Sequence, residues 1–223
     1  MEFIGFIKFG EKEHIEDLVH NGSLFLNTVY AFRDIDNDYR GDKNEGVSNV
    51  IQSENAIVEF SFPQEFGGEL GGKTIRIDKR NGLEGQILIS NKSYRNTNIY
   101  SLYMVEASEQ WKLDPRIDQF GDYGAFIYKP QVFLERVVNA LDREGKQYSY
   151  GSVDYKDRAS FEGELSLFNK FDSYRYQNEF RIIVENNADS PMKLSIGSID
   201  DIAYALPTEC FHNVIIKRVI DES

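Results

Sequence analysis

Short strand-like segments recur along the whole length of this chain, and this pattern constrains its fold more than any other feature. Short runs of apolar or alternating residues, bounded by Gly, Asn, Asp or Ser, predict strands. They lie at 2–9, 24–26, 47–51, 57–62, 74–77, 86–90, 99–105, 125–128, 148–155, 180–184, 193–196, 203–206 and 214–219. These strands outnumber the helices and show no regular βαβ alternation. The sequence therefore predicts an α+β protein with largely antiparallel sheets.

Helical periodicity is clear in two stretches. The first is 11–21, which Gly22 follows as a helix-ending residue. The second begins at Pro130, which suits the first turn of a helix, and ends at Gly145. Each helix has apolar residues on one face: Ile15, Leu18 and Val19 in the first, and Phe133, Val137, Ala140 and Leu141 in the second.

The composition is that of a folded domain without a membrane span. Of the 223 residues, 41% are hydrophobic and 13% are aromatic, which is enough apolar material for a core. No apolar run approaches the roughly 18 residues that suggest a membrane-spanning helix, and residues 1–9 lack the layout of a signal peptide. Cys210 is the only cysteine, so an intramolecular disulfide is impossible. We therefore expect residues 1–223 to form a single domain located in the cytoplasm.

The net charge of −12 restricts the ways in which this chain could bind nucleic acid. Binding regardless of sequence needs a positive surface that releases counterions. A local exception is the segment 73–95, whose cations are opposed within it only by Asp78 and Glu84. The residues expected to contact nucleic acid there are Lys73, Arg76, Lys79 and Arg80, with Tyr94 able to stack on a base. An ordinary soluble hairpin surface is the alternative interpretation.

The stretch 168–185 combines aromatic residues with a carboxylate at the start of a strand. Tyr174 and Tyr176 precede Glu179, which stands directly before the predicted strand 180–184 and two positions before Arg181. Such a carboxylate, with aromatic rings for a flat ligand and arginines for an anion, suits cleavage of the nicotinamide–ribose bond of NAD. The alternative is a solvated strand end with ordinary aromatic packing.

Residues 32–46 form an acidic loop that partly matches a calcium-binding loop. The carboxylates at its ligand positions are Asp34, Asp36, Asp38, Asp42 and Glu45. The position that needs Gly for its sharp turn holds Tyr39, so calcium binding is not expected. Arg33 and Arg40 favour a loop that presents guanidinium groups to a diphosphate. An exposed, salt-bridged loop is the alternative.

No metalloprotease or serine-hydrolase motif is present, since neither HExxH nor GxSxG occurs. His14 and His20 lie six positions apart, which does not place them on one helix face as metal ligands. We therefore expect no metal site. Ser101 stands inside the apolar strand 99–105, where its hydroxyl either bonds within the sheet or orients a catalytic carboxylate.

Several segments occur in a characteristic order: Lys8-Phe9-Gly10, Phe32-Arg33, Arg40-Gly41-Asp42, Glu45-Gly46, Ile99-Tyr100-Ser101-Leu102-Tyr103, Asp114-Pro115-Arg116, Phe120-Gly121-Asp122, and then Phe168, Lys170, Tyr174, Gln177, Glu179 and Arg181. In this order they resemble a family of small bacterial proteins over most of the chain. That family in turn resembles the ADP-ribosyltransferases, including the DarT-like toxins that modify nucleic acid. The second resemblance rests on an early basic residue, a serine in a central strand and a Gln-x-Glu at a late strand.

The resemblance implies an ADP-ribosyltransferase-like fold, with split antiparallel β-sheets, a few flanking helices and a central cleft for NAD. It implies that Glu179 is the catalytic glutamate, with Gln177 and Ser101 as its catalytic partners. The residues that would bind NAD are Lys8, Arg40, Tyr174 and Tyr176. Lys8 departs from the family pattern, which commonly has Arg or His at this position, so Arg40 would take over the phosphate role.

The expected function is NAD-dependent ADP-ribosyl transfer by an intracellular toxin or antiphage effector. NAD would be the donor, nucleic acid the target and an antitoxin protein a partner. Positive charge develops on the ribose carbon as nicotinamide leaves, and a preplaced carboxylate stabilises it. One alternative is a catalytically silent module of the same fold that binds a nucleotide or a protein. Another is a metal-dependent nuclease that uses Asp34, Asp36, Asp38 and Glu45.

Overall fold

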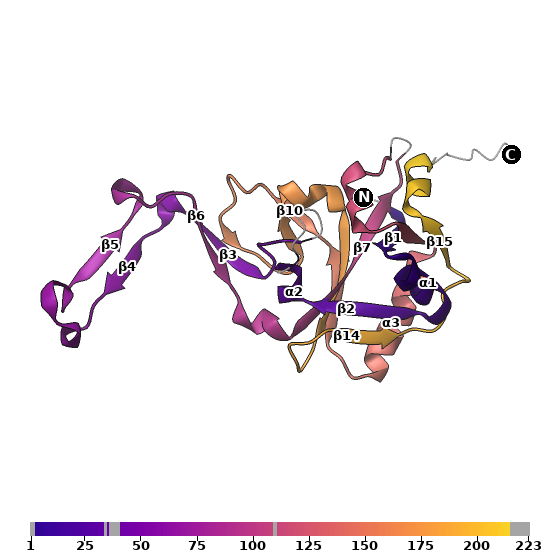
Figure 1. Cartoon of the computed structure of the whole chain (residues 1–223), viewed down its shortest axis with the longest axis horizontal. Helices are drawn as coiled ribbons and strands as arrows, with labels where there is room; N and C mark the ends of the chain where they lie inside the picture. Colours follow the sequence, from indigo (N-terminus) through magenta and orange to yellow (C-terminus); the bar gives the residue numbers. More distant parts are fainter. Residues whose placement is uncertain (1–2, 34, 36–40, 109–110, 215–223) are drawn as a thin grey trace.

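The computed structural model describes residues 3–33, 35, 41–108 and 111–214. Its body is built on one eight-stranded sheet (Figure 1). The strands of this sheet are β1 (Phe3–Gly10), β2 (Ser23–Thr28), β7 (Thr97–Glu106), β8 (Tyr123–Ile127), β9 (Tyr148–Ser152), β13 (Glu179–Glu185), β14 (Met192–Ser195) and β15 (Ala203–Pro207). Each pair of neighbours is antiparallel, as expected for strands that are not joined by regular crossover helices.

The sheet divides along its longest strand, β7. One edge of β7 pairs with β13 over residues 97–103. The other edge pairs with β2 at residues 98 and 99, and with β1 at residues 103–106. Between these two pairings, the Lys8 ammonium group donates a hydrogen bond to the carbonyl oxygen of Ser101 (2.9 Å). This bond gives a partner to a backbone group that the division of the sheet leaves without a neighbouring strand.

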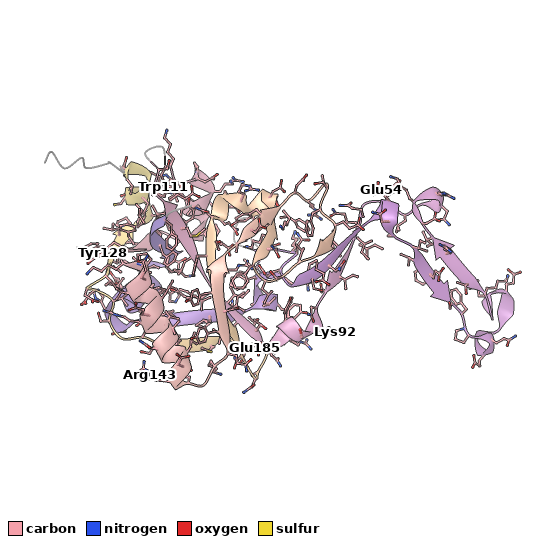
Figure 2. The ribbon with its side chains drawn as sticks, turned by 180° about the vertical axis from the view of Figure 1, so that it is seen from behind. Glu54, Lys92, Trp111, Tyr128, Arg143 and Glu185 are labelled. Carbon is pink, nitrogen blue, oxygen red and sulfur yellow. The ribbon has the colours of Figure 1, made fainter. Side chains whose placement is uncertain are left out.

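Two helices, α1 (Lys12–Asn21) and α3 (Pro130–Arg143), pack on one face of this sheet (Figures 1 and 2). Alternation along β13 directs Phe180, Ile182 and Val184 toward them. The helix residues in this core are those that the periodicity predicts: Ile15, Leu18, Val19, Phe133, Val137, Ala140 and Leu141. The predicted helices and their buried faces are therefore confirmed.

The opposite face of the sheet carries the polar residues of interest. The same alternation places Glu179, Arg181 and Ile183 on this face of β13, opposite Tyr103, Ser101 and Ile99 of β7 respectively. Two apolar clusters lie on either side of Arg181. They are Ile7, Phe9, Tyr103, Val105, Leu113, Ile117 and Phe211 at the Glu179 end, and Val29, Ile99, Leu167 and Ile183 at the other. Arg181 is thereby shielded from water.

The remaining strands form smaller sheets. They are β3 (Val47–Gln52), β6 (Gln86–Ser90) and β11 (Gly163–Glu164) in one sheet, β10 (Asp154–Lys156) parallel to β12 (Asn169–Phe171), and β4 (Val58–Ser61) antiparallel to β5 (Thr74–Ile77). Short helices lie between or after the strands of these sheets and of the main sheet: α2 (Val29–Arg33), η1 (Ser53–Asn55), η2 (Gln64–Phe66), η3 (Gly68–Leu70), η4 (Lys79–Asn81), η5 (Lys92–Asn96), η6 (Pro115–Phe120), η7 (Asp172–Gln177) and η8 (Thr208–Asn213). The hairpin of β4 and β5 projects from the body as an arm, residues 57–80 (Figure 1).

The α+β class and the antiparallel arrangement are confirmed, but one predicted strand is wrong. The segment 148–155 is interrupted at Val153, which separates β9 from β10. Val153 donates its N–H to the carbonyl of Glu179 (2.8 Å), whereas Asp154 donates to the carbonyl of Phe168 (2.8 Å). The chain thus leaves the edge of β13 at this point. Of the last predicted strand, 214–219, Val214 lies in no strand and the rest falls outside the described residues.

The sequence predicted no membrane-spanning helix, and the lengths and compositions of the observed helices can be compared with that prediction. Within the described ranges, none of the helices combines the length and the apolar character that crossing a bilayer requires.

Candidate active site

Glu179 is the first residue of β13, and the backbone around it holds it in place. Asn178, directly before it, adopts the left-handed conformation (φ 36°), which Asn tolerates better than most residues. The Asn178 side chain donates to the backbone carbonyl of Met104 (2.9 Å), and the backbone carbonyl of Asn178 accepts from the Met104 N–H (2.8 Å). The Glu179 N–H donates to the hydroxyl of Tyr155 (2.9 Å). Glu179 therefore enters the sheet in a fixed orientation.

Three donors surround the Glu179 carboxylate. The Ser101 hydroxyl (3.0 Å) and the Nε atom of Arg181 (2.7 Å) donate to Oε2, and the Nζ atom of Lys170 donates to Oε1 (2.5 Å). Burial opposes ionisation, but the charges and hydrogen bonds of Arg181 and Lys170 outweigh it, so the pKa of Glu179 is well below its usual range. The carboxylate is therefore ionised at every physiological pH.

Arg181 links this carboxylate to a second one. Its exposed fraction is 1%, and its guanidinium group forms two hydrogen bonds with Glu45 (2.9 and 2.7 Å). It also donates to the carbonyl oxygen of Leu167 (2.5 Å). Bidentate pairing of this kind fixes geometry as well as charge. Residues 41–46 are thereby anchored to the strand that begins with Glu179.

Lys170 is the second buried cation. Its Nζ atom bonds the side-chain oxygen of Gln177 (2.7 Å) and lies 3.9 Å from carboxylate oxygens of Asp42 and Glu45. Together, these charged side chains form the buried charge cluster: Asp42, Glu45, Lys170, Glu179 and Arg181. The cluster contains one more carboxylate than cations. Burial raises the pKa of Asp42 against the attraction of Lys170, which favours loss of this excess charge by protonation.

A small pocket of about 110 Å³ opens at the Glu179 end of this cluster. Its polar walls are Lys8, Ser101, Lys170, Gln177, Glu179 and Arg181, and its apolar walls are Ile7, Phe9, Phe32, Ile35, Leu102, Tyr103, Ile117 and Phe120. A complete drug-sized ligand needs roughly 300 Å³ or more, whereas a cavity of about 150 Å³ holds a single benzene ring. At about 110 Å³ the pocket is far too small for a whole dinucleotide and somewhat smaller than the cavity that holds benzene.

Four predicted site residues meet at this pocket: Lys8, Ser101, Gln177 and Glu179. The Ser101 hydroxyl bonds the carboxylate of Glu179; that this carboxylate is catalytic and that Ser101 orients it stay predictions. Lys8 comes from the strand on the other side of β7, and its Nζ atom lies 4.4 Å from the centre of the Tyr100 ring. The prediction for Arg40 concerns a residue outside the described ranges.

The two predicted aromatic contacts lie beside the pocket rather than in its lining. Tyr174 has the Lys170 ammonium group 5.1 Å from its ring centre. Tyr176 has the Arg116 guanidinium group 3.8 Å from its ring centre. Both tyrosines belong to η7, and their predicted stacking on nicotinamide stays a prediction. The pocket itself is walled by other rings, those of Phe9, Phe32, Tyr103 and Phe120.

The predicted nucleic-acid residues are divided between the arm and the body. Lys73, Arg76, Lys79 and Arg80 belong to the arm, where Arg76 pairs with Glu59 (3.7 Å) and Lys79 pairs with Glu54 at its base. In Figure 2, Glu54 marks this base, and Lys92 marks the start of η5 on the body. Tyr94 lies in η5 and packs against the cluster that contains Val29 and Ile99. Their role in binding stays a prediction.

The sequence did not indicate several contacts at the candidate site. Nothing local suggested that Lys170 would bond Glu179, or that Glu45 would pair with Arg181 across most of the chain. The one signal was that all four belong to the segments of the resemblance.

The described residues provide little support for the alternative of a metal-dependent nuclease. Among them, no group of three or more His, Cys, Asp or Glu side chains is arranged to hold a metal ion. Asp34, Asp36 and Asp38, on which that alternative depended, lie outside the described ranges. Comparison with protein-family models, with curated proteins and with solved structures finds no match for this chain.

Proposed function

We propose that this chain is an NAD-dependent ADP-ribosyltransferase with Glu179 as its catalytic carboxylate, acting as a cytoplasmic toxin or antiphage effector. The observation that carries the proposal is the hydrogen bond from Ser101 to Glu179 (3.0 Å) on the wall of a small, largely apolar pocket. Lys8 and Gln177 line the same pocket. Lys8, Ser101 and the pair Gln177 and Glu179 come from three distant parts of the sequence and meet at one pocket. They are residues to which the resemblance assigns roles in NAD chemistry.

The pocket suits the nicotinamide end of NAD. Its volume of about 110 Å³ can take at most part of the dinucleotide and would have to widen to enclose the nicotinamide ring, and its walls are aromatic and apolar apart from the residues around Glu179. In the reaction, the bond between nicotinamide and the ribose carbon breaks, and nicotinamide leaves with the electron pair. The acceptor nucleophile then bonds to that carbon. A carboxylate beside the ribose stabilises the positive charge that develops in between.

Glu179 has the electrostatic properties that this role requires. A carboxylate can accept about four hydrogen bonds, and Ser101, Lys170 and Arg181 supply three. One acceptor position is therefore left for a ribose hydroxyl. The lowered pKa keeps the group ionised, which favours charge stabilisation over proton donation.

A catalytically silent binding module is the second candidate, and one observation favours it. Lys170 and Arg181 already neutralise the Glu179 carboxylate, which would weaken its effect on a developing positive charge. Such a module would bind NAD or a related nucleotide in the same pocket without breaking the glycosidic bond.

One experiment separates these candidates. Nicotinamide release from NAD is measured for the wild type, for Glu179→Gln and for the matched control Glu185→Gln, which changes an exposed glutamate of the same strand. We expect Glu179→Gln to lower the rate by about 100-fold or more, as for other preorganised electrostatic groups, and the control to keep full activity.

Thermal unfolding with and without NAD completes the test, because a ligand that binds only the folded state raises the midpoint. A raised midpoint without turnover would favour the silent module. Full turnover by Glu179→Gln would exclude Glu179 as the catalytic carboxylate.

The target that we propose is nucleic acid, and the support is the group of four cations on the arm. Glu54 and Glu59 pair with two of them, so the positive field there is smaller than the segment 73–95 alone indicates.

A further inference from the structure

We propose that Lys170 is a positioning residue, which sets the orientations in which the Glu179 carboxylate and the Gln177 amide meet a ligand in the pocket. This inference rests on the proposed function, since it concerns how Glu179 performs it. Lys170 is 7% exposed, and its Nζ atom donates to Oε1 of Glu179 (2.5 Å) and to the side-chain oxygen of Gln177 (2.7 Å). One buried ammonium group thus holds two residues that line the pocket.

The place of Lys170 comes from the small parallel sheet of β10 and β12. Lys170 is the middle residue of β12 and lies opposite Tyr155 of β10. Residues opposite each other in a sheet share a face, and both of these side chains contact Glu179. The Tyr155 hydroxyl accepts from its backbone N–H (2.9 Å), and Lys170 donates to its carboxylate. One pair of opposite residues therefore holds Glu179 at its backbone and at its carboxylate.

The hydrogen bonds of Glu179 determine which of its oxygens is open to a ligand. Oε2 accepts from Ser101 (3.0 Å) and from Arg181 (2.7 Å), whereas Oε1 accepts from Lys170 alone among the residues that the structure describes. Each carboxylate oxygen can accept about two hydrogen bonds, so the remaining acceptor position belongs to Oε1. The bond from Lys170 therefore sets the direction in which Glu179 can accept a ribose hydroxyl.

The same ammonium group determines which end of the Gln177 amide faces it. An ammonium group has donors only, so the amide oxygen faces Lys170 and the amide nitrogen lies on the other side. That nitrogen is 3.4 Å from the Tyr176 hydroxyl. Lys170 thus fixes an acceptor position on Glu179 and the direction of the donor end of Gln177.

Charge balance and stability do not by themselves account for a lysine at this place. The buried charge cluster keeps one carboxylate in excess even with Lys170 present. Replacing a buried ion pair by apolar side chains of similar volume is often neutral or stabilising. An orienting role, in contrast, needs the ammonium group, because an apolar side chain would leave the oxygens of Glu179 and Gln177 without this donor.

The test uses the compensated variant Asp42→Asn/Lys170→Met beside the single variant Lys170→Met. Met is unbranched and apolar, like the stem of Lys. The single replacement leaves buried carboxylates without a partner and can unfold the chain. The double replacement removes one charge of each sign, so the cluster keeps its excess of one carboxylate. The matched control is Lys156→Met on the neighbouring strand β10, where the ammonium group pairs with Asp154 (2.6 Å).

Nicotinamide release from NAD gives kcat and KM for each folded variant. Misplacing a reacting group by about 1 Å can lower a rate by about 100-fold, so we expect the compensated variant to lose kcat by roughly that factor with an unchanged KM. The control should keep both constants. If Lys170 merely neutralised Glu179, its removal would raise kcat, because the carboxylate would act with its full charge. A kcat that is unchanged or raised would therefore overturn the proposal.

Crystal structures of the wild type and of the compensated variant separate this inference from the proposed function. We expect the Glu179 carboxylate and the Gln177 side chain to change their orientations when Lys170 is replaced, and unchanged orientations would overturn the inference. A wild type that releases no nicotinamide would contradict the proposed function, and the two structures would still decide whether Lys170 positions these side chains.

Lys170→Arg replaces the compensated variant if that variant does not fold. It keeps the positive charge of the cluster, but a planar guanidinium fork does not reproduce the compact ammonium group. The same loss of kcat and the same changes in orientation are then expected, and their absence would contradict the role of Lys170.

Discussion

Arg181 binds Glu45 through two hydrogen bonds (2.9 and 2.7 Å), although the two residues are 136 positions apart in the sequence. The same guanidinium group donates to Glu179 (2.7 Å). All three side chains are buried, so water cannot replace either carboxylate as the partner of Arg181. The position of the proposed catalytic carboxylate therefore depends on the loop that carries Glu45.

Replacing Glu45 should destabilise the fold. Glu45→Gln keeps the shape of the side chain but leaves the buried Arg181 with less negative charge, and breaking such a pair costs about 3–5 kcal/mol. For a chain of this size we expect a fall of roughly 6–20 °C in the thermal midpoint. The control Glu164→Gln, at an exposed position of β11, should change little. Equal midpoints for the two variants would show that the pair contributes nothing to stability.

Removing the Ser101 hydroxyl should affect catalysis more than binding of NAD. Ser101→Ala deletes one donor to Glu179, which corresponds to about 1 kcal/mol, or roughly a fivefold to tenfold lower kcat. Because Ser101 is a positioning residue that acts through Glu179, the KM for NAD should stay the same. Steady-state kinetics on Ser101→Ala and on Ser149→Ala, an exposed serine of β9, measure both constants. A raised KM with unchanged kcat would instead place Ser101 in contact with NAD.

The excess negative charge of the buried charge cluster should make the stability of the fold depend on pH. Burial raises the pKa of Asp42, so the folded state favours the protonated form. The resulting contribution to stability is present below the unfolded pKa of about 3.8 and is lost as pH rises through the folded pKa. Asp42→Asn stays neutral at every pH, so its thermal midpoint should exceed that of the wild type at pH 8.

The midpoint difference for Asp42→Asn should disappear near pH 3, where Asp42 is protonated in the wild type as well. Thermal unfolding at both pH values measures it, with Asp172→Asn, an exposed aspartate in η7, as the control. A lower midpoint for Asp42→Asn at pH 8 would mean that attraction to Lys170 outweighs the cost of burial.

Neutralising the cations of the arm should separate binding of the target from binding of NAD. In the variant in which Lys73, Arg76, Lys79 and Arg80 are all replaced by Gln, we expect loss of transfer to nucleic acid and unchanged release of nicotinamide, because the pocket uses other residues. Labelled NAD is incubated with RNA, single-stranded DNA or total protein extract. Label on protein alone would exclude the nucleic-acid target, and label on nucleic acid that survives the replacement would move its binding surface elsewhere.

Local sequence signals were sufficient for the two longer helices and for most strands of the main sheet, but not for α2, β11 and β12. The apolar periodicity of 11–21 and 130–145 depends on neighbours within two turns, and these helices form as predicted. The short strands are likewise visible as local apolar runs. The break between strands at Val153 was not visible in the sequence, because it depends on hydrogen bonds to the carbonyl groups of Glu179 and Phe168, which lie further along the chain.

The candidate site was partly visible in the sequence. The order of motifs singled out Ser101, Gln177, Glu179 and Lys8, and these residues meet at one pocket. Their meeting depends on strand register, since a slip of one residue in the pairing of β7 with β13 would turn Ser101 and Glu179 to opposite faces. No local pattern specifies that register.

The sequence by itself indicated the two longer helices and most of the strands, and it singled out Lys8, Ser101, Gln177 and Glu179 as candidate site residues. Only the tertiary structure decided that Lys170 and Arg181 neutralise Glu179, that Glu45 holds Arg181 and that Lys8 occupies the division of the sheet. The physical reason is that helix and strand formation follow from the periodicity of neighbouring residues. A buried charge, in contrast, takes whatever partner the long-range packing brings within hydrogen-bond distance.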